Sequence, residues 1–237
     1  MTSAPVPKSI RSVVSKRPDV PSNERHLRMS HGFALLTNFI KSHLLERYCV
    51  VGADKVLDIG CGRGADARRY DSLSVQRYIG TDASSTLIRQ GCDRMQLNRD
   101  HKNGIAVELR ALRHSELLDR RIATLAPFAI ISSFCSLQHV CTSNQLLQST
   151  LLKISHLLGR DCYFVCTLPD GDRIRSLLNH NNGYIKRDLF EFKQPGGEFG
   201  AGNGDRRYLF TLHGSFVDLP EVAVRKDVLI RYVWKVQ

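Results

Sequence analysis

Short apolar runs alternate along the chain with segments whose apolar residues recur at helical spacing. The runs predict five strands, at residues 55–59, 77–81, 105–110, 128–134 and 161–168. Helical periodicity predicts intervening helices near residues 64–71, 84–98 and 143–158. Strands that alternate with helices indicate crossover units, and hence a parallel sheet with helices on both faces. The pattern therefore predicts an α/β fold.

The segments on either side of this alternating region are less regular. We expect a helix from about Ser30, its N-cap, to Tyr48, because Phe33, Leu36 and Ile40 recur at helical spacing. After the fifth strand the pattern predicts a turn at 169–171, a short helix at 173–179 and a glycine-rich loop at 195–204, and residues 184–193 are ambiguous. Alternation at 207–213 and 228–235 predicts two further strands at an antiparallel end of the sheet. The sheet would then be mostly parallel, with seven strands.

Length and composition favour one large domain. Residues 1–24 hold four of the eight prolines, several basic residues and little to bury, which predicts a disordered basic tail before a single domain at residues 25–237. The net charge of +11 favours a polyanionic partner such as nucleic acid. Seven cysteines without a C-x-x-C pair indicate a reducing compartment, nucleus or cytoplasm, with a viral origin left open, and neither zinc nor disulfides. No apolar run approaches the roughly 20 residues of a membrane span, so we expect no membrane association.

A glycine-rich turn follows the first predicted strand. Gly60, Gly62 and Gly64 let a ligand approach the backbone closely, beside the positive end of the next helix. Such a turn suits a dinucleotide or S-adenosylmethionine. Asp58 favours the second, because nicotinamide sites usually carry an apolar residue there, and a cationic sulfonium and amino group favour acidic surroundings. Asp82 ends the next strand, where a carboxylate can accept both ribose hydroxyls.

Four segments carry further motifs, in one order along the chain. They are Asn-Phe-Ile-Lys-Ser at 38–42, Val-Leu-Asp-Ile-Gly-Cys-Gly-Arg-Gly-Ala-Asp at 56–66, Thr-Leu-Pro-Asp at 167–170, and Tyr-Leu-Phe-Thr-Leu at 208–212 followed by Leu-Pro-Glu at 219–221. From about residue 30 to 224 the chain thereby resembles the mRNA cap guanine-N7 methyltransferases. The resemblance implies a Rossmann-like class I methyltransferase fold, S-adenosylmethionine as cofactor and capped RNA as substrate.

The resemblance also implies roles for individual residues. The family's helix lysine reaches the cofactor carboxylate, and the glutamate of its Pro-Glu segment accepts from the donor edge of guanine. Together with the turn, this predicts a cofactor set of Lys41, Asp58, Gly60, Gly62, Asp82 and Phe134. The cap set is Thr37, Asn38, Gln138, His139 and Glu221.

The chain departs from the family at several site positions. After the fourth strand the family shows Gln-Phe-x-Leu-His-Tyr, and an ungapped alignment places Phe134, Gln138 and His139 at its glutamine, histidine and tyrosine. A shift of one residue would place His139 on the histidine, so which of the two residues meets the guanine stays open. Leu112 stands where the family has an acid against adenine, and Val222 replaces the tyrosine after the glutamate.

The expected reaction is methyl transfer to guanine N7 of the 5′ cap. Transfer from a sulfonium to N7 needs no metal, and N7 is unprotonated at neutral pH, so we expect no catalytic base either. Gln138, His139 and Glu221 would act by positioning. Arg63, Arg68 and Arg69 are candidates for binding the phosphates. The alternatives are an impaired methyltransferase-fold subunit that binds RNA or stimulates a capping partner, and a methyltransferase of another substrate class. An associated triphosphatase or guanylyltransferase is left open.

Overall fold

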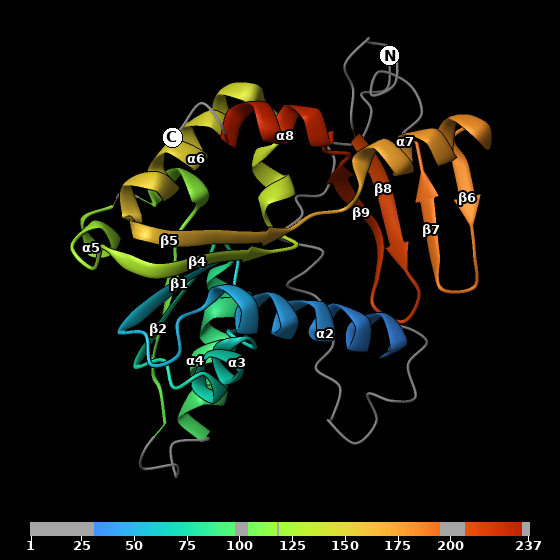
Figure 1. Ribbon diagram of the computed structural model, residues 1–237. Helices are drawn as coiled ribbons and strands as arrows, with labels where there is room; N and C mark the ends of the chain where they lie inside the picture. Colours follow the sequence, from blue (N-terminus) through green and yellow to red (C-terminus); the bar gives the residue numbers. More distant parts are fainter. Residues whose placement is uncertain (1–30, 98–103, 118, 195–206, 234–237) are drawn as a thin grey trace, which may run out of the picture. The chain divides into compact units, whose positions relative to one another are not determined.

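A computed structural model describes residues 31–97, 104–117, 119–194 and 207–233. These residues form two compact units (Figure 1). Of the described residues, the larger unit contains those from Thr37 to Pro169 and those from Asp227 onward, and the smaller unit contains those from Asp170 to Lys226 and those up to Leu36. The predicted tail at 1–24, the Ser30 cap and the loop at 195–204 lie outside the described residues. The single domain at 25–237 stays a prediction.

The larger unit is built on a parallel sheet of five strands. Their order is β3-β2-β1-β4-β5. The strands are β1 (Lys55–Ile59), β2 (Arg77–Asp82), β3 (Ala106–Ala111), β4 (Phe128–Phe134) and β5 (Leu158–Thr167). The chain runs outward from β1 to β3 and then returns to β4 on the other side of β1. The carboxyl ends of β1 and β4 therefore form the switch point at which such sheets bind ligands.

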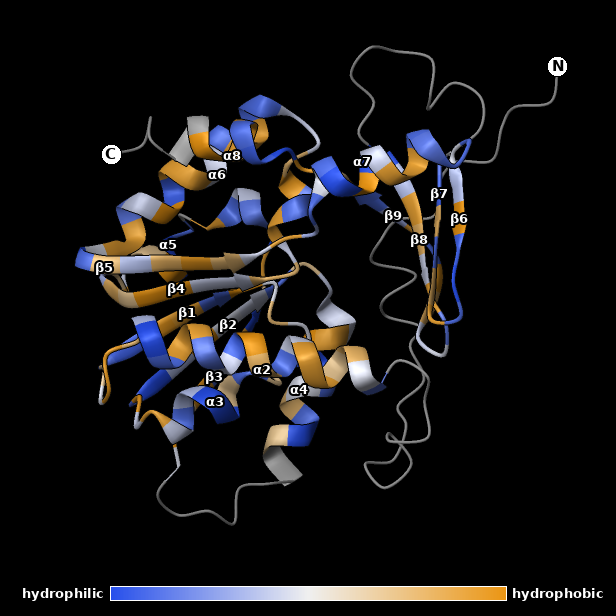
Figure 2. Cartoon of the chain, turned by 45° about the vertical axis from the view of Figure 1, so that its right-hand side comes forward, coloured by the Kyte–Doolittle hydropathy of each residue, from blue (hydrophilic) through white to orange (hydrophobic). Residues whose placement is uncertain are grey.

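Helices cover both faces of this sheet. They are α2 (His31–Tyr48), α3 (Ala67–Ser72), α4 (Ser85–Leu97), α5 (Arg120–Ala123) and α6 (Asn144–Leu157), with short 3-10 turns η2 (His114–Glu116) and η3 (Leu137–Val140). Figure 1 shows α3 and α4 on one face and α6 on the other. The core beneath α2 and α3 contains Leu45, Val56, Tyr70, Tyr78 and Ile130. Figure 2 shows the matching hydrophobic run of β1. The predicted doubly covered parallel sheet is thus confirmed.

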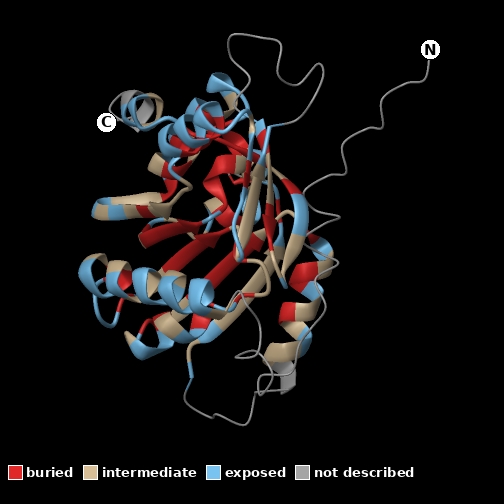
Figure 3. Cartoon of the chain, turned by 90° about the vertical axis from the view of Figure 1, so that its right-hand side faces the viewer, coloured by how far each residue is buried: buried red, intermediate tan, exposed pale blue. Residues whose placement is uncertain are grey.

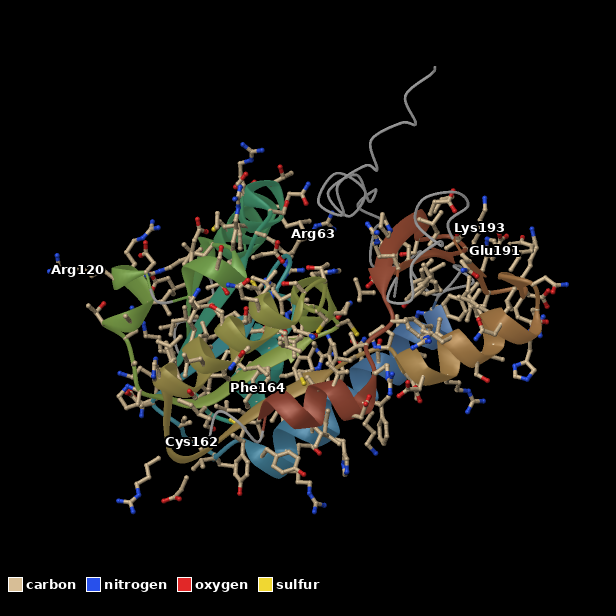
Figure 4. All side chains as sticks on the ribbon, turned by 90° about the horizontal axis from the view of Figure 1, so that it is seen from above. Arg63, Arg120, Cys162, Phe164, Glu191 and Lys193 are labelled. Carbon is tan, nitrogen blue, oxygen red and sulfur yellow. The ribbon has the colours of Figure 1, made fainter. Side chains whose placement is uncertain are left out.

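The smaller unit has a sheet of its own. It contains α7 (Gly171–His180), β6 (Tyr184–Lys186), β7 (Phe190–Lys193), β8 (Arg207–Leu212) and β9 (Phe216–Val222). The four strands are antiparallel, in the order β6-β7-β8-β9, and Figure 4 marks β7 by Glu191 and Lys193. Asp170 caps α7 by accepting from the backbone N–H of Arg173 at 3.0 Å. The predicted helix therefore starts two residues earlier than its periodicity indicated.

The predicted seven-stranded sheet is wrong. The parallel sheet has five strands, because the segments after β5 pair with one another rather than with β5. Their aromatic residues form a separate core, in which Phe192 and Phe210 pack against Ile174, Leu178 and Tyr208.

The strand predicted at 228–235 is also wrong. Within the described residues it is helix α8 (Lys226–Val233). Four of its five apolar residues, at 228, 229, 232 and 233, repeat after four positions, which fits one face of a helix as well as a β-rich run. Asp227 in the first turn favours the helix by interacting with the positive end of its dipole.

A membrane-spanning helix needs a long apolar stretch, and none of the helices within the described ranges has one.

Candidate functional site

The glycine turn after β1 has the backbone geometry that its residues predict. Gly60 has φ +76° and Gly62 has φ +59°, in the left-handed region where a side chain is strained. A Cβ on Gly60 would lie 1.9 Å from Oγ of Ser136, whereas a Cβ on Gly62 would meet no atom within 4 Å. The loop after β4 therefore lies directly against the turn at Gly60, while the turn is open at Gly62.

Asp82 connects the end of β2 to this turn. Its carboxylate accepts from the backbone N–H of Gly62 at 3.0 Å and from that of Ser84 at 2.8 Å. Two backbone donors fix the orientation of the carboxylate, and each oxygen keeps a further lone pair for a ligand hydroxyl. The predicted pairing of the glycine turn with an acid at the end of β2 is thus present, and the acid borders the open side of the turn.

Asp58 lies below the turn, inside the sheet. Only 1% of the residue is exposed, and its two oxygens accept from the hydroxyls of Tyr78 and Ser132, each at 2.7 Å. Burial and the nearby charge of Asp66 raise its pKa to about 6, although the two hydroxyls and Lys41 act in the opposite direction. Asp58 therefore joins β1 to β2 and β4, and direct contact with a cofactor stays a prediction.

Lys41 reaches the far end of the same turn from α2. Its ammonium nitrogen lies 2.8 Å from Oδ2 of Asp66 and 5.2 Å from the ring centroid of Phe134. Asp66, the N-cap residue of α3, also pairs with Arg69. Lys41, Phe134 and the glycine turn, predicted separately, are thus brought together by α2, β4 and β1.

The loop after β4 supplies polar groups that burial leaves unpaired. Gln138 donates its amide to the carbonyl of Cys135 at 2.9 Å, but its Oε1 has no hydrogen-bond partner among the described residues. Nδ1 of His139 is also buried without such a partner. Gln138 is only 2% exposed, so an unpaired acceptor there is costly unless a ligand or water satisfies it.

A second histidine, His114 of η2, lies against this loop. Its Nε2 is 3.4 Å from Oγ of Ser136, the side chain that lies over Gly60. Burial and the neighbouring His139 lower the pKa of His114 to about 4. Burial also lowers the pKa of His139, against the pull of Asp82. Both rings are therefore neutral at physiological pH and can each donate one hydrogen bond and accept another.

Cys61, inside the turn, is a structural residue. It is buried, and burial together with the charges of Asp58 and Asp82 raises the pKa of its thiol well above the ordinary value. A thiol held protonated in this way is a poor nucleophile. The site thus offers an open backbone, a fixed carboxylate, a lysine ammonium and neutral hydrogen-bonding groups, a combination that suits binding and orientation more than covalent chemistry.

Comparison with known proteins identifies the family. A sequence model of the mRNA (guanine-N(7))-methyltransferase domain matches residues 2–235. The chain belongs to the mRNA guanine-N7 methyltransferase family. The mRNA cap guanine-N(7) methyltransferase of Saccharomyces cerevisiae is 26% identical over 226 residues, which cover 81% of this chain and 47% of that protein. That of Schizosaccharomyces pombe is 25% identical over 228 residues, which cover 91% and 62%. The chain thus spans about half the length of the curated relatives it matches.

Solved structures show the same fold. A S-adenosylmethionine-dependent methyltransferase from Clostridium acetobutylicum matches with a TM-score of 0.57 and 15% identity, over 85% of this chain and 78% of that one. The PH0226 protein of Pyrococcus horikoshii matches with a TM-score of 0.59 and 16% identity, over 87% and 82%. The predicted Rossmann-like methyltransferase fold is confirmed. Family and fold together imply S-adenosylmethionine as the cofactor.

The larger unit of this guanine-N7 methyltransferase family member fits that cofactor. Gly62 provides an approachable backbone, and Asp82 beside it keeps acceptor capacity for hydroxyls. Lys41 carries a positive charge suited to a carboxylate, and Asp66 already pairs with both Lys41 and Arg69. Phe134 borders Lys41 instead of the family's glutamine. Leu112 is buried after β3, so it leaves the position of the family's acid without a charge.

The residues predicted to bind the cap and its phosphates differ in exposure and in hydrogen-bond partners. Thr37 lies one helical turn before Lys41 and is half-buried, while the neighbouring Asn38 is exposed. Arg63, labelled in Figure 4, donates to Oε1 of Gln90 at 2.7 Å, and Arg68 is exposed. Arg69 faces inward, donating to Oγ of Ser42 at 3.2 Å besides pairing with Asp66. Their roles toward phosphate and cap stay predictions.

Glu221 belongs to the smaller unit. It lies on β9, paired in register with Tyr208 of β8, and is buried. Val222, in place of the family's tyrosine, is buried too. A carboxylate on the inner face of this sheet is unusual enough to support a role in binding, and its proposed contact with guanine stays a prediction.

The sequence did not point to Asp66, Ser136 or His114 as site residues. Asp66 stood inside the quoted turn motif, but its pairing with Lys41 depends on the position of α2. Ser136 and His114 follow β4 and β3, at the carboxyl ends where parallel sheets bind ligands. The rule that ligands bind at these ends would have selected Ser136 and His114, but it would not have predicted the contact between them.

Proposed function

We propose that the protein transfers a methyl group from S-adenosylmethionine to guanine N7 of the 5′ cap of mRNA. The family match over residues 2–235 supports this assignment. The structural observation that carries it is the hydrogen bond from the N–H of Gly62 to Asp82, beside the open side of the glycine turn. That pair gives a cofactor both a backbone to approach and a carboxylate for its hydroxyls.

On the cofactor side, we assign Asp82 and Gly62 to the ribose and Lys41 to the carboxylate. The bound cofactor supplies an electrophilic methyl group on a cationic sulfonium. The carboxylate of Asp82 beside the turn favours a cation there. No residue needs to remove a proton, because guanine N7 carries none at neutral pH.

On the cap side, we assign the guanine to Gln138 and His139, with Thr37 and Asn38 as further cap contacts, all in the larger unit. For Glu221, the assignment to guanine rests on the family resemblance alone. The unpaired Oε1 of Gln138 can accept from a guanine N–H, and a neutral His139 can accept or donate. Correct orientation of the acceptor nitrogen contributes several kcal/mol to such a transfer. This is why binding residues alone can account for catalysis.

The proposal extends to partners and compartment. Capped RNA suits the net charge of +11, and Arg63 and Arg68 are candidates for contact with its phosphates. A capping triphosphatase or guanylyltransferase is a candidate partner. Seven cysteines without a paired motif suit a reducing compartment, nucleus or cytoplasm.

Incubation of the purified protein with labelled S-adenosylmethionine tests the proposal. RNA with a GpppG cap should be labelled, and nuclease digestion should release the label as 7-methylguanosine. Matched RNAs with a 5′ triphosphate or an ApppG cap should stay unlabelled. Equal labelling of all three RNAs, or none with or without a capping partner, contradicts the proposal.

A further inference from the structure

The outer face of α2 carries a row of flat side chains that continues onto β5. The row consists of Phe39, His43, Arg47 and Tyr48 of α2 and Tyr163 of β5, and we refer to it as the planar stripe. All five residues belong to the larger unit. Figure 3 shows the exposed residues along α2, and Figure 4 marks β5 by Cys162 and Phe164, the neighbours of Tyr163.

Three pairs of neighbours within the planar stripe lie close to one another. The rings of Phe39 and His43 are one helical turn apart, nearly parallel at 8°, with centroids separated by 6.2 Å. Arg47 follows His43 by another turn, and its guanidinium lies 5.7 Å from the ring centroid of Tyr48. Tyr48 lies 5.2 Å from Tyr163, centroid to centroid. The stripe therefore runs from the middle of α2 to the edge strand of the sheet.

Packing accounts for this face of α2 only at Tyr48, which is partly buried against the core. The helix contributes Leu45 to the core, and Lys41 faces the glycine turn. Phe39, by contrast, is 69% exposed and Tyr163 is 53% exposed, so neither ring contributes much to stability by burial. Exposed rings in a row, with a guanidinium among them, form the kind of platform on which the bases of single-stranded nucleic acid stack.

We propose that the planar stripe binds the single-stranded RNA that follows the cap. The inference rests on the proposed function, which makes capped RNA the substrate. Charge supports a polyanion such as RNA over a basic or neutral occupant: the chain carries +11, and Arg47 and Arg160, three residues before Tyr163, are both exposed. Glu46 and Asp161 are the exposed acids next to them, so the stripe itself is close to balanced and stacking must supply much of the affinity.

Equilibrium binding separates the planar stripe from the catalytic site. Fluorescence anisotropy with an uncapped 12-nucleotide RNA should show at least about fivefold weaker binding for Phe39→Ala and for Tyr163→Ala. Phe39→Trp should retain binding because it keeps a stacking ring, whereas Phe39→Leu should bind as weakly as the alanine variant. Leu152→Ala, at a position 46% exposed on α6, is the matched control and should bind like the wild type.

Methylation assays then connect the stripe to the substrate. The wild type should methylate a capped 12-mer with a higher kcat/KM than the GpppG dinucleotide. Phe39→Ala should remove that advantage and leave the rate on the dinucleotide unchanged. Equal kcat/KM values for dinucleotide and capped 12-mer in the wild type, or wild-type RNA affinity in both alanine variants, overturn the proposal.

Two further outcomes would identify a different occupant of the stripe or a failure of the proposed function alone. Self-association that Phe39→Ala abolishes in sedimentation velocity, without a change in RNA affinity, would make the stripe a contact between copies and overturn the proposal. If the wild type methylates neither substrate but Phe39→Ala still weakens RNA binding, the proposed function fails while the stripe remains an RNA-binding surface.

Discussion

The ammonium nitrogen of Lys41 lies 2.8 Å from Oδ2 of Asp66, at the end of the glycine turn. Asp66 also pairs with Arg69, so one largely buried carboxylate holds two cations. A cofactor carboxylate that binds Lys41 must therefore share the lysine with Asp66. Because Arg69 also pairs with Asp66, Lys41 can bind the cofactor without leaving Asp66 unpaired. The ion pair with Asp66 orients the ammonium group of Lys41 and leaves it able to donate to a second carboxylate.

Replacement of this lysine should weaken cofactor binding far more than folding. For Lys41→Gln we expect roughly tenfold or greater loss of affinity for S-adenosylhomocysteine, because a charge-assisted hydrogen bond contributes about 1.5–3 kcal/mol. Unfolding should become easier by only about 1 kcal/mol, since Arg69 still pairs with Asp66. Isothermal titration calorimetry and urea unfolding measure the two effects. Lys55→Gln, which removes a lysine paired with the exposed Asp54, is the control. Unchanged affinity would assign Lys41 to structure alone.

Asp82 should contribute to cofactor binding through the ribose hydroxyls. Asp82→Ala removes the acceptor of the Gly62 and Ser84 N–H groups, which should cost roughly 1–3 kcal/mol of unfolding free energy. The wild type should bind S-adenosylhomocysteine more tightly than its 2′,3′-dideoxy analogue, and the variant should bind both equally weakly. Asp54→Ala, at an exposed acid, should behave like the wild type. A variant that still distinguishes the two ligands would place the ribose elsewhere.

The central part of the fold follows from local patterns in the sequence. β1 and β4 have the predicted bounds, because the short apolar runs at 55–59 and 128–134 end at a glycine turn and a polar loop. The second sheet was not predicted, since Phe190 and Phe192 acquire their partners from β8, about 20 residues away along the chain. Its separation from the parallel sheet depends on a core with α7, which no local pattern encodes.

The site was predictable where one motif contains the whole arrangement. Gly60 and Gly62 directly follow β1 and Asp82 ends the next strand, β2, so their spacing in the sequence carries their geometry. The contact of Ser136 with His114 joins loops after β4 and β3, which are separated by two other strands of the sheet. Asp58 was interpreted as a cofactor residue because of its motif position, and only the structure shows that Tyr78 and Ser132 use both of its oxygens.

Asp58 should make stability depend on pH. Its folded-state pKa of about 6 lies above the unfolded value near 4. Between these two pH values Asp58 is therefore protonated in the native state and ionised in the unfolded state. Its stabilising contribution is therefore full below about pH 4 and is lost as the pH rises through 6. His114, with its pKa lowered to about 4, acts in the opposite direction over the same range.

Comparison with Asp58→Asn isolates the aspartate from this background. The unfolding free energy of the wild type minus that of the variant should fall by up to about 3 kcal/mol between pH 4 and pH 7. Urea unfolding at several pH values measures it. Parallel profiles for the two proteins would mean that Asp58 is ionised in the native state at an ordinary pKa.

Gly60 should be intolerant of alanine for two separable reasons. Its φ of +76° strains any side chain, and a Cβ would lie 1.9 Å from Oγ of Ser136. Gly52 has the same φ of +76°, but a Cβ there would meet nothing within 4 Å. Gly52→Ala therefore measures the strain alone, expected at roughly 1–2 kcal/mol. Gly60→Ala should cost about 1–3 kcal/mol more, because the Ser136 loop must move away from the turn.

Removal of the serine side chain provides the decisive comparison. Ser136→Gly in the Gly60→Ala background should restore stability to about the level of Gly52→Ala, since the clash disappears and only the φ strain remains. Cofactor affinity, measured by calorimetry, should fall in Gly60→Ala and recover in part in the double variant, because the loop can again lie against the turn. If Gly52→Ala and Gly60→Ala are equally destabilised, or if Ser136→Gly rescues neither property, the Ser136 side chain does not lie over Gly60 in solution and the loop is not held there.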